Sequence, residues 1–307
     1  MSVDNLLRAT LEEKYAVEKS YGRTEDEITE HIQVLLEWAK KQPHLPQEID
    51  EKLIKRILRW NKFSLEKTKN KIDMYFSIKN IVPEFFDERD MTSSKYQRHI
   101  KSVLLLPLPK LTKEFSRVLL FSYLNNNPDN FDFTLHVKYI FITLDVQYFN
   151  DDCLTNILIL DMGNATISHC LKNNPVVLNK IRAVIQKAYS DRVAAVHFIN
   201  LPSYAETMVT LTKSLMKAKM ADRVHVHKNY ESLHKMVPKE ILPAEYGGRE
   251  KSVNELYADW TKCLQDNNDW ILKYGALRSN EKLRQGEPID ADIFGSIHGS
   301  FRQLTVD

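Results

Sequence analysis

Glycine is scarce in this sequence, and the short motifs in which glycine supports chemistry are missing. Only 8 of the 307 residues are glycine, and neither GxGxxG nor GxxxxGK[ST] occurs. No loop therefore offers the row of backbone N–H groups that a nucleotide phosphate needs. The GxSxG elbow of many hydrolases is absent as well. The sequence predicts a protein that is not an enzyme and that uses no cofactor.

Long apolar runs and a signal-peptide pattern are also absent. The apolar stretch 103–108, VLLLPL, falls well short of the ~20 residues that a transmembrane helix needs. Residues 1–15, MSVDNLLRATLEEKY, carry acids where a signal peptide has its apolar core. The three cysteines, Cys153, Cys170 and Cys263, show no CxxC or Cys/His spacing, which indicates reduced thiols. These features predict a cytoplasmic protein.

Three histidines are the candidates for a metal site. His225 and His227 fall on one face of an expected strand, and His197 falls on another strand. Zinc would require further ligands and supporting hydrogen bonds. A polar-faced strand or a core histidine requires neither, so we predict no metal site.

Charge is nearly balanced over the whole chain but not along it. The formal net charge of +2 argues against a nucleic-acid partner. The segment from Lys52 to Lys71 contains only one acid, Glu66, and is otherwise strongly basic. Its basic residues are Lys52, Lys55, Arg56, Arg59, Lys62, Lys67, Lys69 and Lys71. A solvated helical face is one interpretation, and a docking patch for anionic lipid headgroups is the other.

The periodicity of the chain changes near residue 116. Before it, the pattern is helical, with a capping box at Thr24-x-x-Glu27, a stop at Pro43 and another helix start at Ser64. After it, residues 117–124, 155–160, 193–199 and 223–227 have strand patterns, with helical patterns between them. This alternation predicts an α/β fold in which an all-helical N-terminal domain precedes a mostly parallel sheet.

One expected helix is unusually apolar. In the segment 203–216, apolar side chains cover an arc of roughly 200°, about twice what a surface helix needs. Two explanations remain open on this pattern alone. The helix is either fully buried between layers, or one flank faces a cavity that an apolar ligand fills.

Three stretches resemble a known family. They are LILDMGNATISHC (158–170), NKIRAVIQKAYSDRVAAVHFINLP (179–202) and KAKMADRVHVHKNYESLHKMVPKEILPAEYGG (217–248). They are similar to the CRAL-TRIO lipid-binding domain, above all to its branch of tocopherol and retinaldehyde carriers, and the similarity covers roughly residues 20–265. The closing FGSIHGSFRQLTVD resembles tails of insect members. In the turn before Arg249, we expect Gly247 and Gly248 to adopt backbone angles that other residues avoid.

The resemblance implies an architecture. An N-terminal helical domain would occupy residues 1–90, the CRAL-TRIO domain residues 91–250, and a C-terminal helix with an irregular tail residues 251–307. In the family, a sheet floors an apolar cavity, and a mobile gate helix closes it. The apolar segment 203–216 falls where that gate lies.

The resemblance also implies site residues, for each of which ordinary core packing is the alternative. The matching cavity positions are Leu160, Ile167, Ile181, Val184, Ile185, Tyr189, Val193, Val196, Val209, Leu211 and Leu215. Arg192, Lys219 and Arg223 match a basic cleft for phosphoinositide headgroups, with Lys62 as a partial substitute. Asn61 and Ala194 stand where that cleft has arginines.

The function that the resemblance implies is that of a carrier. It would bind one small hydrophobic ligand, such as a tocopherol, retinoid, carotenoid or other lipid, and exchange it while peripheral at a membrane surface. Two alternatives stay open: a phosphatidylinositol or phosphoinositide exchange protein, and a scaffold that binds protein partners.

Overall fold

The chain begins with a group of helices. The computed structural model describes residues 6–7, 9–189, 192–214, 218–287 and 289. The helices of this region are α2 (Leu11–Ser20), α3 (Glu25–Lys40), α4 (Glu51–Trp60), α5 (Leu65–Ile81), α6 (Pro83–Phe86) and α7 (Ser94–His99). Thr24 forms the predicted capping box with Glu27, and the Ser64 side chain accepts from the backbone N–H of Lys67. Each cap satisfies a backbone donor that the first helical turn leaves unpaired, which confirms both predicted helix starts.

A five-stranded sheet follows. Its strands are β1 (Val103–Leu111), β2 (Ser116–Tyr123), β3 (Thr155–Asp161), β4 (Val193–Ile199) and β5 (Val224–Val226), in the order β1-β2-β3-β4-β5. The pair β1/β2 is antiparallel, and the other three pairs are parallel. The predicted α/β fold with a mostly parallel sheet is confirmed.

The strand β1 was not among the expected strands. Its sequence, VLLLPLPKL, contains Pro107 and Pro109, which lack the N–H that a central strand must donate. The strand is tolerated because it lies at the edge of the sheet and pairs only with β2, with a register irregularity between Pro107 and Leu111. The prolines that obscure the strand in the sequence therefore fit its position.

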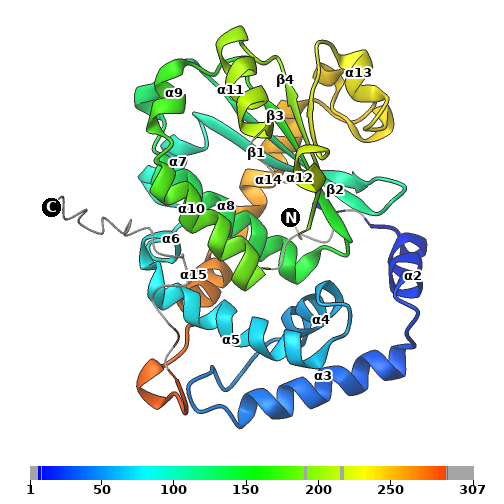
Figure 1. Ribbon diagram of the computed structural model, residues 1–307, viewed down its shortest axis with the longest axis vertical. Helices are drawn as coiled ribbons and strands as arrows, with labels where there is room; N and C mark the ends of the chain where they lie inside the picture. The colour runs from blue at the N-terminus through cyan, green and yellow to red at the C-terminus, as the bar shows by residue number, and fades with distance from the viewer. Residues whose placement is uncertain (1–5, 8, 190–191, 215–217, 288, 290–307) are drawn as a thin grey trace, which may run out of the picture.

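Helices connect the parallel strands. They are α8 (Phe133–Asn150) between β2 and β3, α9 (Ile167–Lys172), α10 (Pro175–Val184) and the π-helical turn η2 (Ile185–Tyr189) between β3 and β4, and α11 (Ser203–Ser214) and α12 (Ala218–Ala221) between β4 and β5. A short 3₁₀ turn, η1 (Pro128–Asn130), precedes α8. Each of these connections leads to the next strand in the order of the sheet, always in the same direction. Because such crossovers are right-handed, they place the connecting helices on one face of the sheet (Figure 1).

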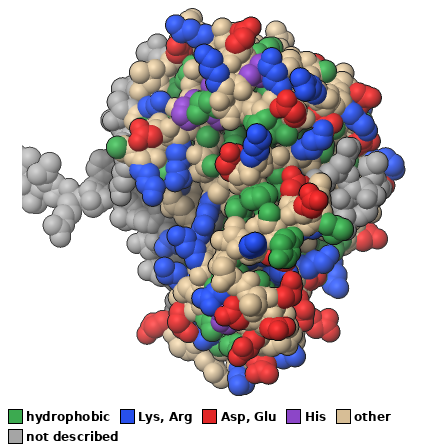
Figure 2. Space-filling model, turned by 90° about the vertical axis from the view of Figure 1, so that its right-hand side faces the viewer, with side chains coloured by type: hydrophobic (Ala, Val, Ile, Leu, Met, Phe, Trp, Pro, Cys, Tyr) green, Lys and Arg blue, Asp and Glu red, His purple; other side chains and the backbone are tan. Residues whose placement is uncertain are grey.

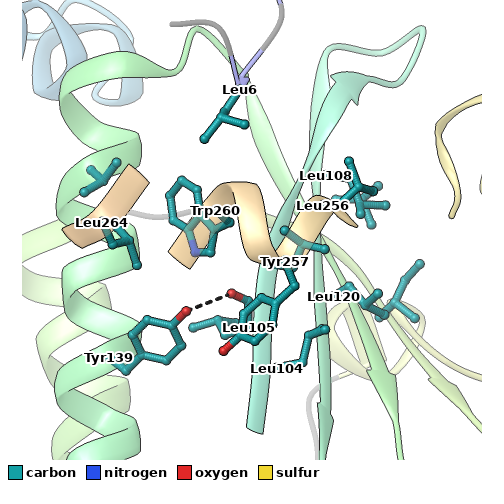
Figure 3. Packing of buried hydrophobic residues seen from close by; sticks show 14 of the residues in the cluster. Leu6, Leu104, Leu105, Leu108, Leu120, Tyr139, Leu256, Tyr257, Trp260 and Leu264 are labelled. Atoms are coloured by element: carbon teal, nitrogen blue, oxygen red, sulfur yellow. Dashed lines mark hydrogen bonds between the residues drawn. The ribbon is translucent and has the colours of Figure 1, made fainter. Parts of the chain in front are cut away.

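The opposite face is covered by the chain after β5. This part contains α13 (Tyr230–His234), η3 (Lys239–Ile241), η4 (Ala244–Tyr246), α14 (Val253–Asp266), α15 (Asn268–Ala276) and η5 (Glu281–Leu283). Ile157, Ile159 and Ile199 of the sheet share one buried cluster with Leu233 and Ile241. The same cluster extends to α14, whose Trp260 is 1% exposed and packs between α8 and the β1/β2 pair (Figure 3).

Two adjacent glycines have different roles in the turn before Arg249. Gly247 has a φ of 69°, in the left-handed region that favours glycine. Gly248 has no positive φ, but a Cβ at this position would lie 1.9 Å from the backbone oxygen of Leu242. The expectation of unusual backbone angles is therefore correct for Gly247 and wrong for Gly248, which is required for close backbone approach.

Arginines of the basic segment join the helical region to the sheet. Arg56 donates to the carbonyls of Asp151 (2.6 Å) and Cys153 (2.9 Å), and Arg59 pairs with Asp152 (3.0 Å) and Glu18 (2.5 Å). Both arginines are at most 5% exposed. Neither proposed interpretation of the basic segment, a solvated face or a lipid-docking patch, therefore applies to these two arginines.

The surface seen in Figure 2 carries mixed charge. Lysines and arginines alternate there with aspartates and glutamates, and hydrophobic side chains are scattered among them. No described helix is both long and apolar enough to cross a membrane.

Candidate functional site

One face of the sheet keeps apolar side chains that the protein does not fully cover. Leu158 and Leu160 on β3, Val196 and Phe198 on β4, and Val226 on β5 are all partly exposed, and the strand register places them side by side. We call these five residues the open sheet face. Strands β3 and β4 are inner strands, whose side chains normally lie in a packed layer.

The opposite face of β3 and β4 is more completely covered. Ile157 is 8% exposed, Ile159 is fully buried, and His197 and Ile199 are each 1% exposed. Successive side chains of a strand point to opposite faces of the sheet. The difference in exposure is therefore a difference between the two faces of the sheet and not between strands. The incomplete cover lies on the side of the crossover helices.

The helix α11 makes a hydrogen bond near each of its ends, one to the loop after β3 and one to β5. Near its start, the Tyr204 hydroxyl donates to the carbonyl of Ala165 at 2.9 Å. Near its end, Lys213 Nζ donates to the carbonyl of Val224 at 2.5 Å. Ala205 is buried, and Val209 is partly buried. Among the described side chains of α11, these two hydrogen bonds connect the start of the helix to the loop after β3 and its end to β5.

Two of the predicted cavity positions come together on the sheet. Leu160 and Val196 belong to the open sheet face, and Val193 is partly buried at the start of β4. Val209 is partly buried on α11. The side chain of Leu211 and the whole of Leu215 lie outside the described residues. The structure therefore places a subset of the predicted positions around one apolar surface.

The predicted positions on α10 and η2 lie elsewhere. Val184 is fully buried and Tyr189 is 1% exposed, and both belong to a core cluster that α4, α5 and α8 share. Ile181 and Ile185 are partly buried against the same cluster. Ile167, on α9, is 58% exposed. These five positions surround the domain junction or face solvent and are not part of the open sheet face.

A buried polar network explains the position of Tyr189. Its hydroxyl donates to Asp145 Oδ1 at 2.7 Å, and the Tyr75 hydroxyl donates to the same oxygen at 2.8 Å. Arg89 pairs with the other oxygen at 2.5 Å. Burial, and after it the Asp145 charge, raises the pKa of Tyr189 well above its ordinary value, so the hydroxyl remains a donor. Tyr189 thus links η2 to the N-terminal helices.

The four predicted basic residues differ in what they contact. Arg192 donates to the carbonyl of Trp60 at 2.5 Å, and Arg223 donates to the carbonyl of Val193 at 2.8 Å. Lys62 and Lys219 are exposed. Lys219 lies on α12, directly after the α11 region, and Lys62 follows α4. The two arginines therefore have structural contacts, and the two lysines remain available at the surface.

Several site features had no prediction from the sequence. Leu171, Val176 and Leu178, on α9 and α10, are 79%, 45% and 46% exposed, and together with Ile167 they form what we call the apolar rim. Alternation of apolar and polar residues was a usable signal for Phe198 and Val226, which lie next to histidines, but not for Leu158, which lies in the apolar run 157–160. The rim gave no such signal, because exposed apolar side chains in a short helix look like core positions.

Metal-site geometry is absent from the part of the chain that the structure describes. No group of three or more His, Cys, Asp or Glu side chains there has an arrangement that holds a metal ion. The three cysteines are unpaired thiols. The described geometry offers apolar contact and hydrogen bonding.

Comparisons with known proteins show what this chain is similar to. Residues 101–248 match the family model described as "CRAL/TRIO domain", and residues 24–96 match that described as "Pinta-like, UBA domain". The chain is 25% identical over 246 residues to the human protein "Alpha-tocopherol transfer protein-like", covering 79% of this chain and 71% of that protein. It is 27% identical over 237 residues to mouse "Clavesin-1", covering 74% and 66%.

A solved structure is also similar to this chain. The crystal structure of Sfh5 aligns over 87% of this chain and 98% of its own, with a TM-score of 0.49 and 15% sequence identity.

Proposed function

We propose that this chain, whose residues 101–248 match the CRAL/TRIO domain model, carries one small hydrophobic ligand between membranes. The ligand would lie between the open sheet face and α11. Ligands of the tocopherol, retinoid or carotenoid kind fit such a surface because they are almost wholly apolar. We propose a carrier without catalytic activity, located in the cytoplasm and transiently at membranes.

The observation that carries this proposal is the contrast between the two faces of the sheet. Five neighbouring apolar side chains, four of them on the inner strands β3 and β4, remain partly exposed, although the other face of β3 and β4 is more completely covered. Covering apolar surface contributes about 25 cal/mol per Å², so a ligand that covers roughly 100 Å² of it gains about 2.5 kcal/mol. An occupant of this surface is therefore favoured.

Exchange at a membrane is supported by the apolar rim. Its four side chains, Ile167, Leu171, Val176 and Leu178, are all between 45% and 79% exposed on α9 and α10. Exposed Lys219 and half-exposed Met220 lie on α12, after α11. Apolar side chains beside a lysine suit the interface of an anionic bilayer. We propose that this side docks when the ligand enters or leaves.

The test is a titration of the purified chain with all-trans-retinol and with a fluorescent tocopherol analogue. We expect saturation at about one ligand per chain, since the open sheet face is a single surface. Phosphatidylinositol serves as the competitor. Stoichiometric binding of phosphatidylinositol without competition from either isoprenoid would contradict the proposal and favour an exchange protein for phosphoinositides.

A further inference from the structure

Three histidine rings contact one another where β4 meets β5. His197 on β4 lies opposite His225 in the strand register, and His227 follows directly after β5. The ring centroid of His197 is 5.1 Å from that of each other histidine, and those two are 6.5 Å apart. His197 is 1% exposed and His227 is 7% exposed. We call these three residues the histidine cluster.

Hydrogen bonds determine where the protons of the cluster lie. The Ser232 hydroxyl donates its hydrogen to the carbonyl of Asn229 at 2.8 Å, so its oxygen must accept from His227 Nδ1 at 3.1 Å. The other nitrogen of a neutral His227 is then an acceptor. It lies 2.8 Å from His197 Nδ1, which must be the donor. The hydrogen bonds therefore run in one direction, from donor to acceptor: from His197 to His227, from His227 to Ser232, and from Ser232 to the carbonyl of Asn229.

An additional proton on His227 is incompatible with this pattern of hydrogen bonds. Protonated Nε2 would point an N–H at the N–H of His197 across 2.8 Å, so the hydrogen bond would become a repulsion unless His197 moved its own proton to Nε2. We propose that the histidine cluster is a proton-operated release that loosens β5 and the end of α11 and so lets the ligand leave in acid. The inference rests on the proposed carrier function, because it describes how that same ligand site opens.

The surroundings of the cluster do not compensate a positive charge. Burial is the main cause that lowers the pKa of His197, to about 3, and the rings of His227 and His225 lower it further. Burial also lowers the pKa of His225 and of His227. The charge of Lys213 on α11 lowers the pKa of His225 further. His225 in turn lowers the pKa of His227, whereas the hydrogen bond with Ser232 raises it.

Other titratable groups lie close to the cluster. Tyr230 and Glu231 of α13 line a cleft of about 340 Å³ that His227 also lines, and Lys228 follows His227 in the chain. Glu231 is exposed, so solvent screens its charge. From the β3 side, His197 is paired with Ile159, which carries no charge.

The direction of the pH effect follows from the lowered pKa values. The closed state holds the rings neutral, so its stability is fully present above the ordinary histidine pKa of about 6.5. It decreases as the pH falls below that value, because a state with the rings in water binds more protons. Protons are enriched at anionic membrane surfaces, where the carrier would release its ligand.

A direct connection links the cluster to the ligand site. β5 is the edge strand, has three residues, and pairs with β4 alone among the described strands. The carbonyl of Val224 at its start accepts from Lys213 of α11 at 2.5 Å. A shift of β5 away from β4 therefore removes the bond that holds the end of α11. Val226 moves with it, and Val226 is part of the open sheet face.

The first experiment measures release of all-trans-retinol from the full chain to neutral phosphatidylcholine vesicles at pH 7.5 and at pH 5.5. We expect the release rate to rise about fivefold or more at the lower pH. In the double variant His197→Gln, His227→Gln, whose amides can donate and accept but not titrate, the change should stay below about twofold. His31→Gln, on α3, is the matched control and should behave as the native chain.

The second experiment needs no ligand. Amide hydrogen exchange of the ligand-free native chain, corrected for intrinsic exchange, should show lower protection at pH 5.5 than at pH 7.5 in β5 and α11 but not in α14. Unchanged protection in β5 and α11 would overturn the proton-operated release even if retinol binds. If retinol does not bind but protection changes as expected, the carrier function is contradicted and the pH-dependent opening stands.

Discussion

At the scale of single residues, two valines separate ligand surface from core. Val196 lies on the open sheet face and is partly exposed, whereas Val184 is fully buried in the cluster that joins α10 to the N-terminal helices. The sequence resemblance predicted both as cavity positions. A close-packed interior does not accept additional volume without strain, so the two sites should respond differently to the same enlargement.

We expect Val196→Trp to keep the melting temperature of the ligand-free chain within a few degrees and to weaken retinol binding at least about tenfold, or 1.4 kcal/mol. The ring would enter space that the ligand occupies. Val184→Trp should instead destabilise the chain by about 1–3 kcal/mol or more. Thermal melts and binding titrations of both variants check this. Normal affinity in Val196→Trp would show that the ligand does not lie on the open sheet face.

At the scale of elements, the crossover helix α9 is far less embedded than α14. Ile167 and Leu171 of α9 are 58% and 79% exposed, in contrast to Trp260 of α14 at 1%. Exposed apolar side chains on neighbouring short helices are typical of an interaction surface. An apolar rim on α9 and α10 fits a site that opens against a bilayer.

We expect Leu171→Asp to slow ligand transfer to vesicles several-fold, since an acid at the rim costs about 1–3 kcal/mol of membrane contact. Equilibrium affinity for retinol in solution should be unchanged, because Leu171 is outside the open sheet face. Leu272→Asp, at a 40% exposed leucine on α15, is the control. Transfer that is equally fast in all three proteins would exclude the apolar rim as the docking surface.

At the scale of the whole molecule, the helical region and the sheet region share one core. Val137 and Phe141 of α8 lie in the same buried cluster as Leu53 and Ile72 of the N-terminal helices. The chain also returns after α15, where Arg284 pairs with Asp73 through two bonds of 2.8 Å. The packing of α8 against the N-terminal helices crosses the predicted domain boundary at residue 90. The boundaries at residues 90 and 250 stay a prediction.

We expect a single cooperative unfolding transition for the full chain in calorimetry, with equal calorimetric and van't Hoff enthalpies. A fragment of residues 97–307 should fail to fold, because it exposes the α8 and η2 side chains that the N-terminal helices cover. Dye binding and circular dichroism of the fragment report this. Two resolved transitions, or a fragment with a cooperative melt, would show that the regions are independent.

The sequence alone determined the features that depend on neighbouring residues. Caps at Thr24, Ser64 and Ser252 specify helix starts through contacts within one turn. The alternation of strand and helix patterns specified an α/β fold with a parallel sheet, and matched stretches such as ILPAEYGG (241–248) pointed to the family.

Only the tertiary structure decided which apolar or charged side chains remain uncovered. Val184 and Val196 look alike in the sequence, and Arg56 looks like the exposed lysines around it. Their burial depends on partners far away in the chain, such as Asp151 for Arg56 and Leu53 for the Val184 cluster. Burial is a property of what packs against a residue, and local pattern carries no information about which distant segment that will be.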